Sequence, residues 1–246
     1  SASLVGSEMC IRDRNYTYFA ISFSQPVIRY GYTDRKKVNY PGGFRRFNTA
    51  ENFPEIGGRK VVSYFEFKEG SAPLEIKVAL SAVGTDGALK NLQAETTGKS
   101  FDTIRKETNG KWENALSVID AKGSNDQLSM LYTSLYHTMI NPSVYMDVDG
   151  KYRGIDHNIH QAEGFTNYTV FSVWDTYRAL HPLFNIIKRD VSTDLVKSML
   201  AHYNQSVHHL LPVWSHMGNE NWCMIGYHSV SVLACLLYKS DAADEL

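Results

Sequence analysis

The sequence has little cysteine and no long apolar run. Its 246 residues include three cysteines, Cys10, Cys223 and Cys235, which are too few and too scattered for a disulfide framework or a cysteine metal cluster. The longest apolar stretch, residues 230–238, is about half of the roughly 20 residues that a membrane-spanning helix needs. The net charge is −1 with both signs mixed along the chain, so the basic patch that nucleic acid requires is absent.

Several catalytic and metal-binding motifs are also absent. The sequence contains no His-Glu-x-x-His pair, no Gly-x-Ser-x-Gly turn and no glycine-rich phosphate loop. His202 and His209 are two helical turns apart, too far to bind one ion, so we expect no zinc site. Residues 147–150, Asp-Val-Asp-Gly, resemble the start of a calcium loop but lack its later ligands, and we interpret them as a hairpin turn.

The two ends read differently from the rest of the chain. Residues 1–14 and 235–246 resemble translated sequencing-adapter reads, and we interpret them as an artefactual leader and tail. The natural segment is then about residues 15–234, in which Cys223 is the one cysteine. Without the natural N-terminus, a signal peptide cannot be judged.

Residues 15–100 are predicted to form an antiparallel β-sandwich. Short runs rich in aromatic and β-branched residues are separated by turn-forming Pro and Gly. A strict alternation in residues 74–80 predicts a half-buried strand whose apolar face points to the core. That apolar face consists of Leu74, Ile76, Val78 and Leu80. The other predicted strands are residues 16–23, 27–32 and 61–67.

The rest of the chain is predicted to be mainly helical. Residues 101–123 are charged and compatible with a linker helix between two domains. Ser124 and Gln127 fit a capping box, and the apolar residues that follow recur at helical spacing. Helices joined by polar loops favour part of an all-α toroid over residues 124–234. The further helices are expected at residues 172–187 with a bend near Pro182, from a cap at Ser192, and from about Cys223 onward.

Two segments, residues 171–182 and 218–228, combine a tryptophan with a carboxylate at the expected start of a helix. An indole ring can stack on the C–H face of a sugar, and a carboxylate can accept hydrogen bonds from its hydroxyls. The structural alternatives are a core tryptophan with a capping aspartate in the first segment, and a solvated glutamate in a turn after Gly218 in the second. The candidate binding residues are Trp174, Asp175, Glu220, Trp222 and His228.

These segments resemble glycoside hydrolase family 92, the exo-acting α-mannosidases. The resemblance rests on Trp174-Asp-Thr-Tyr-Arg-Ala-Leu-His-Pro182 and on Gly218-Asn-Glu-Asn-Trp-Cys-Met-Ile-Gly-Tyr-His228. It covers about residues 15–234 and implies an N-terminal β-sandwich, a linker helix and the first part of an (α/α)6 catalytic toroid. It also implies calcium-dependent hydrolysis of terminal α-mannosides, α-1,2-linked, with inversion.

The chain departs from the family pattern in its catalytic groups. Inversion requires an acid and a base about 6.5–9.5 Å apart, and the family carries them in a Glu-Gly-Asn and a Gly-Asn-Asp-Asp segment. Neither segment occurs here, nor does the family's Asn-Glu-Pro segment near the calcium. We therefore assign no catalytic residue and no metal ligand, and we expect the chain alone to be inactive. An incomplete ring of helices also leaves apolar faces uncovered, which predicts poor solubility.

The resemblance makes Trp174 and Asp175 the first candidates for mannose binding, followed by Glu220, Trp222 and His228. The expected partners are mannose-containing glycans, and the expected location is the periplasm, the cell surface or the exterior of a bacterium. The alternative is a non-catalytic carbohydrate-binding module on the sandwich, which the aromatic strands of residues 15–100 favour.

Overall fold

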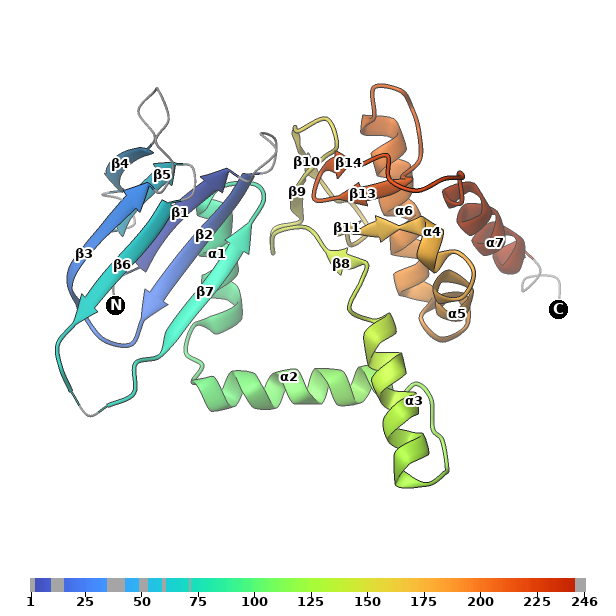
Figure 1. The fold of residues 1–246 in the computed structure, drawn as a ribbon, viewed down its shortest axis with the longest axis horizontal. Helices are drawn as coiled ribbons and strands as arrows, with labels where there is room; N and C mark the ends of the chain where they lie inside the picture. The colour runs from blue at the N-terminus through green and yellow to red at the C-terminus, as the bar shows by residue number, and fades with distance from the viewer. Residues whose placement is uncertain are drawn as a thin grey trace. The chain divides into compact units, whose positions relative to one another are not determined.

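The computed structural model describes residues 3–9, 16–34, 43–48, 53–58, 61–70 and 72–241 (Figure 1). The chain divides into two compact units. The first unit contains residues 1–104 and 146–151, and the second contains residues 105–145 and 152–246. Antiparallel strands in the first part of the chain are followed by helices, which confirms that part of the predicted fold class. The closed toroid and the predicted domain limits stay predictions.

The first unit contains a five-stranded sheet with the order β4-β5-β1-β2-β7 and a separate antiparallel pair, β3 and β6. Within the larger sheet β1 pairs in parallel with β5, and the other pairs are antiparallel. The strands predicted at 16–23, 27–32 and 61–67 are all present. The strands are β1 (Ser3–Met9), β2 (Tyr16–Phe23), β3 (Val27–Asp34), β4 (Gly43–Asn48), β5 (Phe53–Gly58), β6 (Val61–Phe67) and β7 (Ile76–Ser81).

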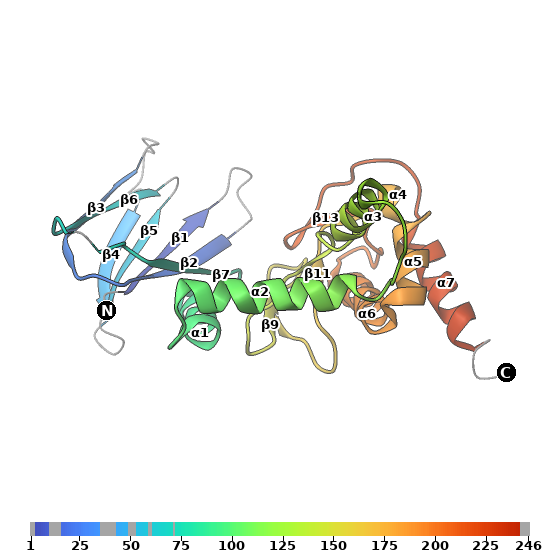
Figure 2. The same cartoon turned by 90° about the horizontal axis from the view of Figure 1, so that it is seen from below.

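Helix α1 (Thr85–Thr96) covers the face of the larger sheet opposite β3 and β6 (Figure 2). Small side chains let it approach, since Ala20 and Ala88 are both fully buried and Ala79 packs beside them. On the other face the ring of Phe23 lies 4.8 Å from that of Phe65, between centroids. The larger sheet therefore has α1 on one side, and on the other side the second sheet contacts it at Phe23.

The predicted orientation of β7 is wrong. Ile76, Val78 and Leu80 are 55%, 55% and 60% exposed, whereas Ser81, on the opposite face, is buried. The reason is that α1 packs on the face that carries the small and polar residues of β7, including Lys77, whose ammonium group donates to the carbonyl of Thr96 at the end of α1. Alternation located the strand correctly, but it did not show which face a helix would cover.

The Asp-Gly turn at residues 147–150 belongs to the first unit. Gly150 has a φ of +80°, and its N–H donates to the Asp147 carbonyl, which confirms the predicted turn. The Asp147 N–H also donates to the Lys151 carbonyl at 2.8 Å across the turn, and β9 (Lys151–Arg153), which follows the turn, pairs with β10 (Ile159–Gln161). The Asp147 carboxylate is 3% exposed and accepts hydrogen bonds from the Ser81 hydroxyl (2.7 Å) and the Asn91 amide (2.9 Å).

Helices α2 (Phe101–Leu116) and α3 (Asn125–Thr138) occupy the segments where the first two helices were predicted. The capping box is confirmed, because the Ser124 hydroxyl accepts the Gln127 N–H and the Gln127 side chain accepts the Ser124 N–H. The ring of Trp112 on α2 lies 4.6 Å from that of Tyr136 on α3, which joins the two helices.

The helix predicted at residues 172–187 is broken earlier than expected. It consists of α4 (Val173–Thr176) and α5 (Leu180–Ile187), and the break falls at residues 177–179. Pro182 is the third residue of α5, where its missing N–H is tolerated because the first turn has no helical acceptor for it. The expected bend at Pro182 is therefore wrong.

The last two helices also begin elsewhere than predicted. Helix α6 spans Arg189–Gln205, so Ser192 lies inside it, is buried, and donates its hydroxyl hydrogen to the Asn185 side-chain oxygen instead of capping the helix. Helix α7 spans Ser229–Asp241 and begins six residues after Cys223. The intervening backbone is not helical, because three of the residues around it have positive φ angles: Trp222, Met224 and Gly226.

The core of the second unit lies between α5, α6 and α7 and the short strands beside them. Leu195 and Met199 of α6 are fully buried there. None of the helices in the described ranges has the length and apolarity to cross a membrane. The core residues are Phe171, Val173, Phe184, Leu195, Met199, Leu211 and Val232. The remaining short strands are β8 (Ser143–Val144), β11 (Tyr168–Thr169), β12 (Phe171–Ser172), β13 (Trp214–His216) and β14 (Asn219–Glu220).

Candidate functional site

The two tryptophan–carboxylate segments lie side by side in the second unit. Strand β13 is the centre of a three-stranded antiparallel sheet, with β12 from the first segment on one edge and β14 from the second on the other. The turn between β13 and β14 has two residues, Met217 and Gly218, with φ angles of +48° and +71°. Positive φ at both positions is the geometry that joins hairpin strands most tightly. The turn predicted at Gly218 is confirmed.

Four side chains from the two segments form a cluster of rings and one cation. The imidazole of His228 stacks on the ring of Tyr177, with centroids 4.0 Å apart and planes inclined by 10°, and lies 5.3 Å from the ring of Trp174. The Arg178 guanidinium lies 5.7 Å from the Trp174 ring and 5.2 Å from the Tyr177 ring. It also donates from Nε to the Tyr177 hydroxyl at 2.7 Å. The cluster brings together residues that the sequence places in two separate segments.

Asp175, which follows Trp174 in the sequence, is exposed. Its carboxylate accepts a hydrogen bond from the Ser172 hydroxyl, one turn earlier. Because an ionised carboxylate has about four acceptor positions, this bond leaves acceptors directed to solvent. Arg178, also exposed, offers guanidinium donors nearby in sequence. An exposed acceptor, an exposed donor and half-buried aromatic rings are the groups that bind a sugar through its hydroxyls and its C–H face.

Glu220 has different surroundings. Its side chain is 7% exposed, and its two oxygens accept three backbone N–H groups. Oε2 accepts from Val213 at 3.0 Å, and Oε1 accepts from Trp214 at 2.9 Å and from Trp222 at 3.0 Å. The Nε2 atom of His202 lies 3.8 Å from Oε2. The carboxylate is thus directed into the protein, and its role as a sugar ligand stays a prediction.

Trp222 is 54% exposed and has a φ of +52°, a left-handed conformation that costs a residue with a Cβ about 1–2 kcal/mol. Such a conformation persists where surrounding contacts enforce it. Because more than half of the Trp222 side chain is exposed, the indole is accessible to a ligand.

Two histidines of the second unit are buried. His181, the second residue of α5, is 2% exposed, and neither ring nitrogen has a hydrogen-bond partner. Burial lowers its pKa from 6.5 to about 4, because the charged form would lose its hydration without compensation. Burial also lowers the pKa of His202, and the neighbouring Glu220 carboxylate opposes that shift. Both imidazoles are neutral near pH 7.

Of the five predicted binding residues, Trp174 and His228 lie together, and Asp175 is exposed near them in sequence. Sequence reasoning did not select Tyr177 and Arg178 individually. A signal for them existed, because they follow Trp174 by three and four residues, which is the spacing of neighbours on a helix. The partner that fixes Tyr177 is His228, and that contact could not be read from local spacing.

Within the described ranges, no group of three or more His, Cys, Asp or Glu side chains could hold a metal ion. The calcium ligands that the resemblance implies are expected in other segments of the parent enzyme, and no chemical step is assigned to calcium.

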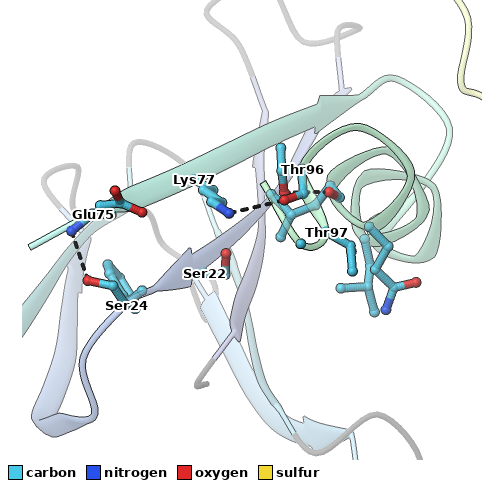
Figure 3. A pocket seen from close by; sticks show the side chains of 11 residues that line it. Ser22, Ser24, Glu75, Lys77, Thr96 and Thr97 are labelled. Carbon is cyan, nitrogen blue, oxygen red and sulfur yellow. Dashed lines mark hydrogen bonds between the residues drawn. The ribbon is translucent and has the colours of Figure 1, made fainter. Parts of the chain in front are cut away.

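The first unit has a hollow of about 400 Å³ between α1 and strands β2 and β7 (Figure 3). It bears on the alternative of a carbohydrate-binding sandwich. Its polar groups are partly engaged already: the Lys77 ammonium donates to backbone carbonyls, and the Ser24 hydroxyl accepts the Glu75 N–H at 2.9 Å. Its one aromatic lining residue, Phe23, packs against Phe65 on β6. Among the described residues, the lining of the hollow therefore offers no free aromatic ring on which a sugar could stack.

Comparison with known proteins decides the family. The sequence profile of the glycosyl hydrolase family 92 catalytic domain matches residues 87–245, well over half of the chain. The chain belongs to glycoside hydrolase family 92. No curated protein matches it.

Solved family 92 structures resemble the chain over most of its length. The α-mannosidase BT3965 from Bacteroides thetaiotaomicron is 41% identical, with a TM-score of 0.80 over 92% of this chain and 30% of that protein. BT3965 has also been solved in complex with mannoimidazole. The inverting mannosidase BT2199 from the same bacterium is 28% identical, with a TM-score of 0.75 over 93% of this chain. The chain thus spans about 30% of the length of these family 92 enzymes.

Proposed function

We propose that this chain is part of a glycosidase that hydrolyses terminal α-mannosides, α-1,2-linked, with inversion. The observation that carries the proposal is the ring cluster of Trp174, Tyr177, Arg178 and His228, with the exposed carboxylate of Asp175 beside it in sequence. The family membership and the mannosidase relatives support it. Mannose-containing glycans are the proposed partners.

In this proposal the residues of this chain bind and orient the sugar. The Trp174 ring takes the C–H face of the mannose, while Asp175 accepts from its hydroxyls and Arg178 donates to them. The acid and base of an inverting enzyme must stand about 6.5–9.5 Å apart, with water between them and the sugar. Glu220 is assigned neither role, because both of its oxygens already accept backbone N–H groups.

The remaining parts of the activity are proposed to lie in other segments of the parent enzyme. These are the acid, the base and the calcium ligands, so this chain alone is expected to release no mannose. A location in the periplasm, at the cell surface or outside a bacterium is proposed from the family, as is a role in degrading mannose-rich N-glycans.

Ligand-detected NMR tests the binding role, since saturation transfer reports weak affinities. Mannoimidazole is mixed with this chain, and glucoimidazole serves as the stereochemical control. We expect saturation of the mannoimidazole ring protons that falls about tenfold in Trp174→Ala, because the stacking interaction is lost. Trp112→Ala is the matched control, since Trp112 packs against Tyr136 on α3. Equal saturation in all three proteins, or equal saturation of both imidazoles, would contradict the proposal.

The expected inactivity is measured separately. The chain is incubated with α-1,2-mannobiose in the presence and absence of added calcium, and free mannose is quantified. Release above the level of a heat-denatured sample would show that the cleaving groups lie within these 246 residues.

A further inference from the structure

Residues 221–228 connect β14 to α7 and form a loop with a strained backbone. Three of its first six residues have positive φ: Trp222 at +52°, Met224 at +68° and Gly226 at +87°. Two of these three carry a Cβ, for which the left-handed conformation is unfavourable. Residues 221–227 are all exposed, so the loop has little burial of its own to compensate. Its conformation must therefore be held by contacts at its ends.

Both ends of the loop are fastened to one short segment, residues 211–214. At the far end, the Leu211 N–H donates to the Tyr227 hydroxyl at 2.6 Å, and the Ser229 hydroxyl, fully buried, donates to the Pro212 carbonyl. At the near end, Asn221 donates from its backbone N–H to the Trp214 carbonyl at 3.1 Å. The two ends of the loop are thus hydrogen-bonded to the same segment, residues 211–214.

Glu220 makes the remaining contacts at the near end. One of its carboxylate oxygens, Oε1, accepts both the Trp214 N–H and the Trp222 N–H. It therefore connects the fixed segment directly to the first strained residue of the loop. Hydrogen bonds to a buried charged acceptor are about twice as strong as those between neutral groups. This bond fixes the peptide plane that leads into Trp222, and so it fixes the direction in which the loop leaves β14.

The last residue of the loop is His228, whose ring stacks on Tyr177 and lies near the ring of Trp174. Gly226 is also required there, since a Cβ on it would lie 2.4 Å from His228 Nε2. The loop from Trp222 to Gly226 leads to the imidazole on one side, and the bonds of Tyr227 and Ser229 to residues 211–212 hold it on the other. We propose that Glu220 is a positioning residue: its buried carboxylate holds the strained loop 221–228 so that His228 stacks on Tyr177 and completes the ring cluster.

Only the consequence for sugar binding rests on the proposed function; the placement of His228 does not. The test uses this chain with ¹³C-labelled histidine and compares Glu220→Gln with Glu163→Gln, an exposed glutamate in the same unit. A ring stacked at 4.0 Å shifts the His228 signal upfield, and a His228→Asn variant identifies that signal. The amide introduced by Glu220→Gln must direct its NH₂ group at backbone donors. We therefore expect the upfield shift to be lost in Glu220→Gln and kept in Glu163→Gln.

Amide hydrogen exchange and mannoimidazole saturation transfer test the same inference by other routes. If Glu220→Gln does not fold, hydrogen exchange in the unaltered chain decides: the Trp222 amide should exchange roughly tenfold to hundredfold slower than the exposed Met224 amide. Equal exchange rates would overturn the inference. Mannoimidazole saturation transfer separates the roles, since loss of binding with an unchanged His228 signal would make Glu220 a direct ligand and overturn the positioning role. A displaced His228 signal in Glu220→Gln supports the positioning role even if the unaltered chain binds no mannoimidazole. Absence of mannoimidazole binding would count only against the proposed function.

Discussion

Replacing His181 with leucine should remove much of the acid sensitivity of the fold. His181 is 2% exposed, and both of its ring nitrogens lack hydrogen-bond partners. Burial lowers the pKa of its imidazole from 6.5 to about 4. Between these two pH values the unfolded chain binds a proton that the folded chain does not bind. The free energy of unfolding therefore falls as the pH is lowered from about 6.5 toward 4.

The magnitude follows from the difference between the two pKa values. One pKa unit corresponds to about 1.4 kcal/mol, so protonation of His181 removes about 3 kcal/mol of stability once the pH is below 4. At about pH 5 the loss is about 2 kcal/mol, a large fraction of the stability of a typical domain. Leucine has a similar volume and no polar atoms, so the substitution also removes two unsatisfied groups and should stabilise the protein near neutral pH by about 1–3 kcal/mol.

The measurement is urea unfolding of both proteins near pH 7.5 and near pH 5, followed by circular dichroism. The unaltered chain should lose about 2 kcal/mol more than His181→Leu between the two conditions. His202 also titrates with a lowered pKa, but it is present in both proteins and cancels in the comparison. His208→Leu, at an exposed position, is the matched control and should behave like the unaltered chain. An equal loss in His181→Leu would refute the reasoning.

Three further substitutions test particular contacts. Gly87→Ala places a Cβ 2.1 Å from a carboxylate oxygen of Asp147, so we expect a loss of about 2 kcal/mol in urea unfolding; an unchanged midpoint would contradict the docking of the 147–150 turn. Ser124→Ala removes the capping box of α3 and should cost about 1 kcal/mol, measurable as a lower melting temperature, and Ser124→Asp should restore it. Gly226→Ala should cost about 1–2 kcal/mol and remove the upfield NMR shift of His228, because φ is +87° and the space is already occupied; a retained shift would show that the ring is placed by other contacts.

Helix positions were predicted well where a local signal set them and poorly where packing did. The capping box at Ser124 starts α3 as predicted, because it depends on residues three apart in the sequence. Ser192 looked like a similar cap, yet its hydroxyl donates to Asn185 and the helix begins before it. Pro182 looked like the point of a bend, yet the break comes earlier and Pro182 fits the first turn of α5.

Two of the predicted binding residues meet in the structure, but the arrangement around them was not predicted. Trp174 and His228 come together, which could be inferred from their motifs only by resemblance. The sequence could not show that the Glu220 carboxylate turns toward three backbone N–H groups, because those donors belong to a segment whose path depends on the sheet β12-β13-β14. The stacking of His228 on Tyr177 likewise could not be predicted, because the two residues belong to segments that are joined only through the pairing of β12 and β14 with β13.

The sequence by itself determined the family, the positions of strands β2, β3, β6 and β7, the start of α3 and the turns at Gly150 and Gly218. These features depend on residues close together in the chain, or on motifs long enough to be specific. Only the tertiary structure decided that α1 covers the polar and small face of β7, that Glu220 points inward, and that His228 stacks on Tyr177. Each of those outcomes is a contact between segments distant in the sequence, and the competition for such contacts is settled by packing, which no local pattern encodes.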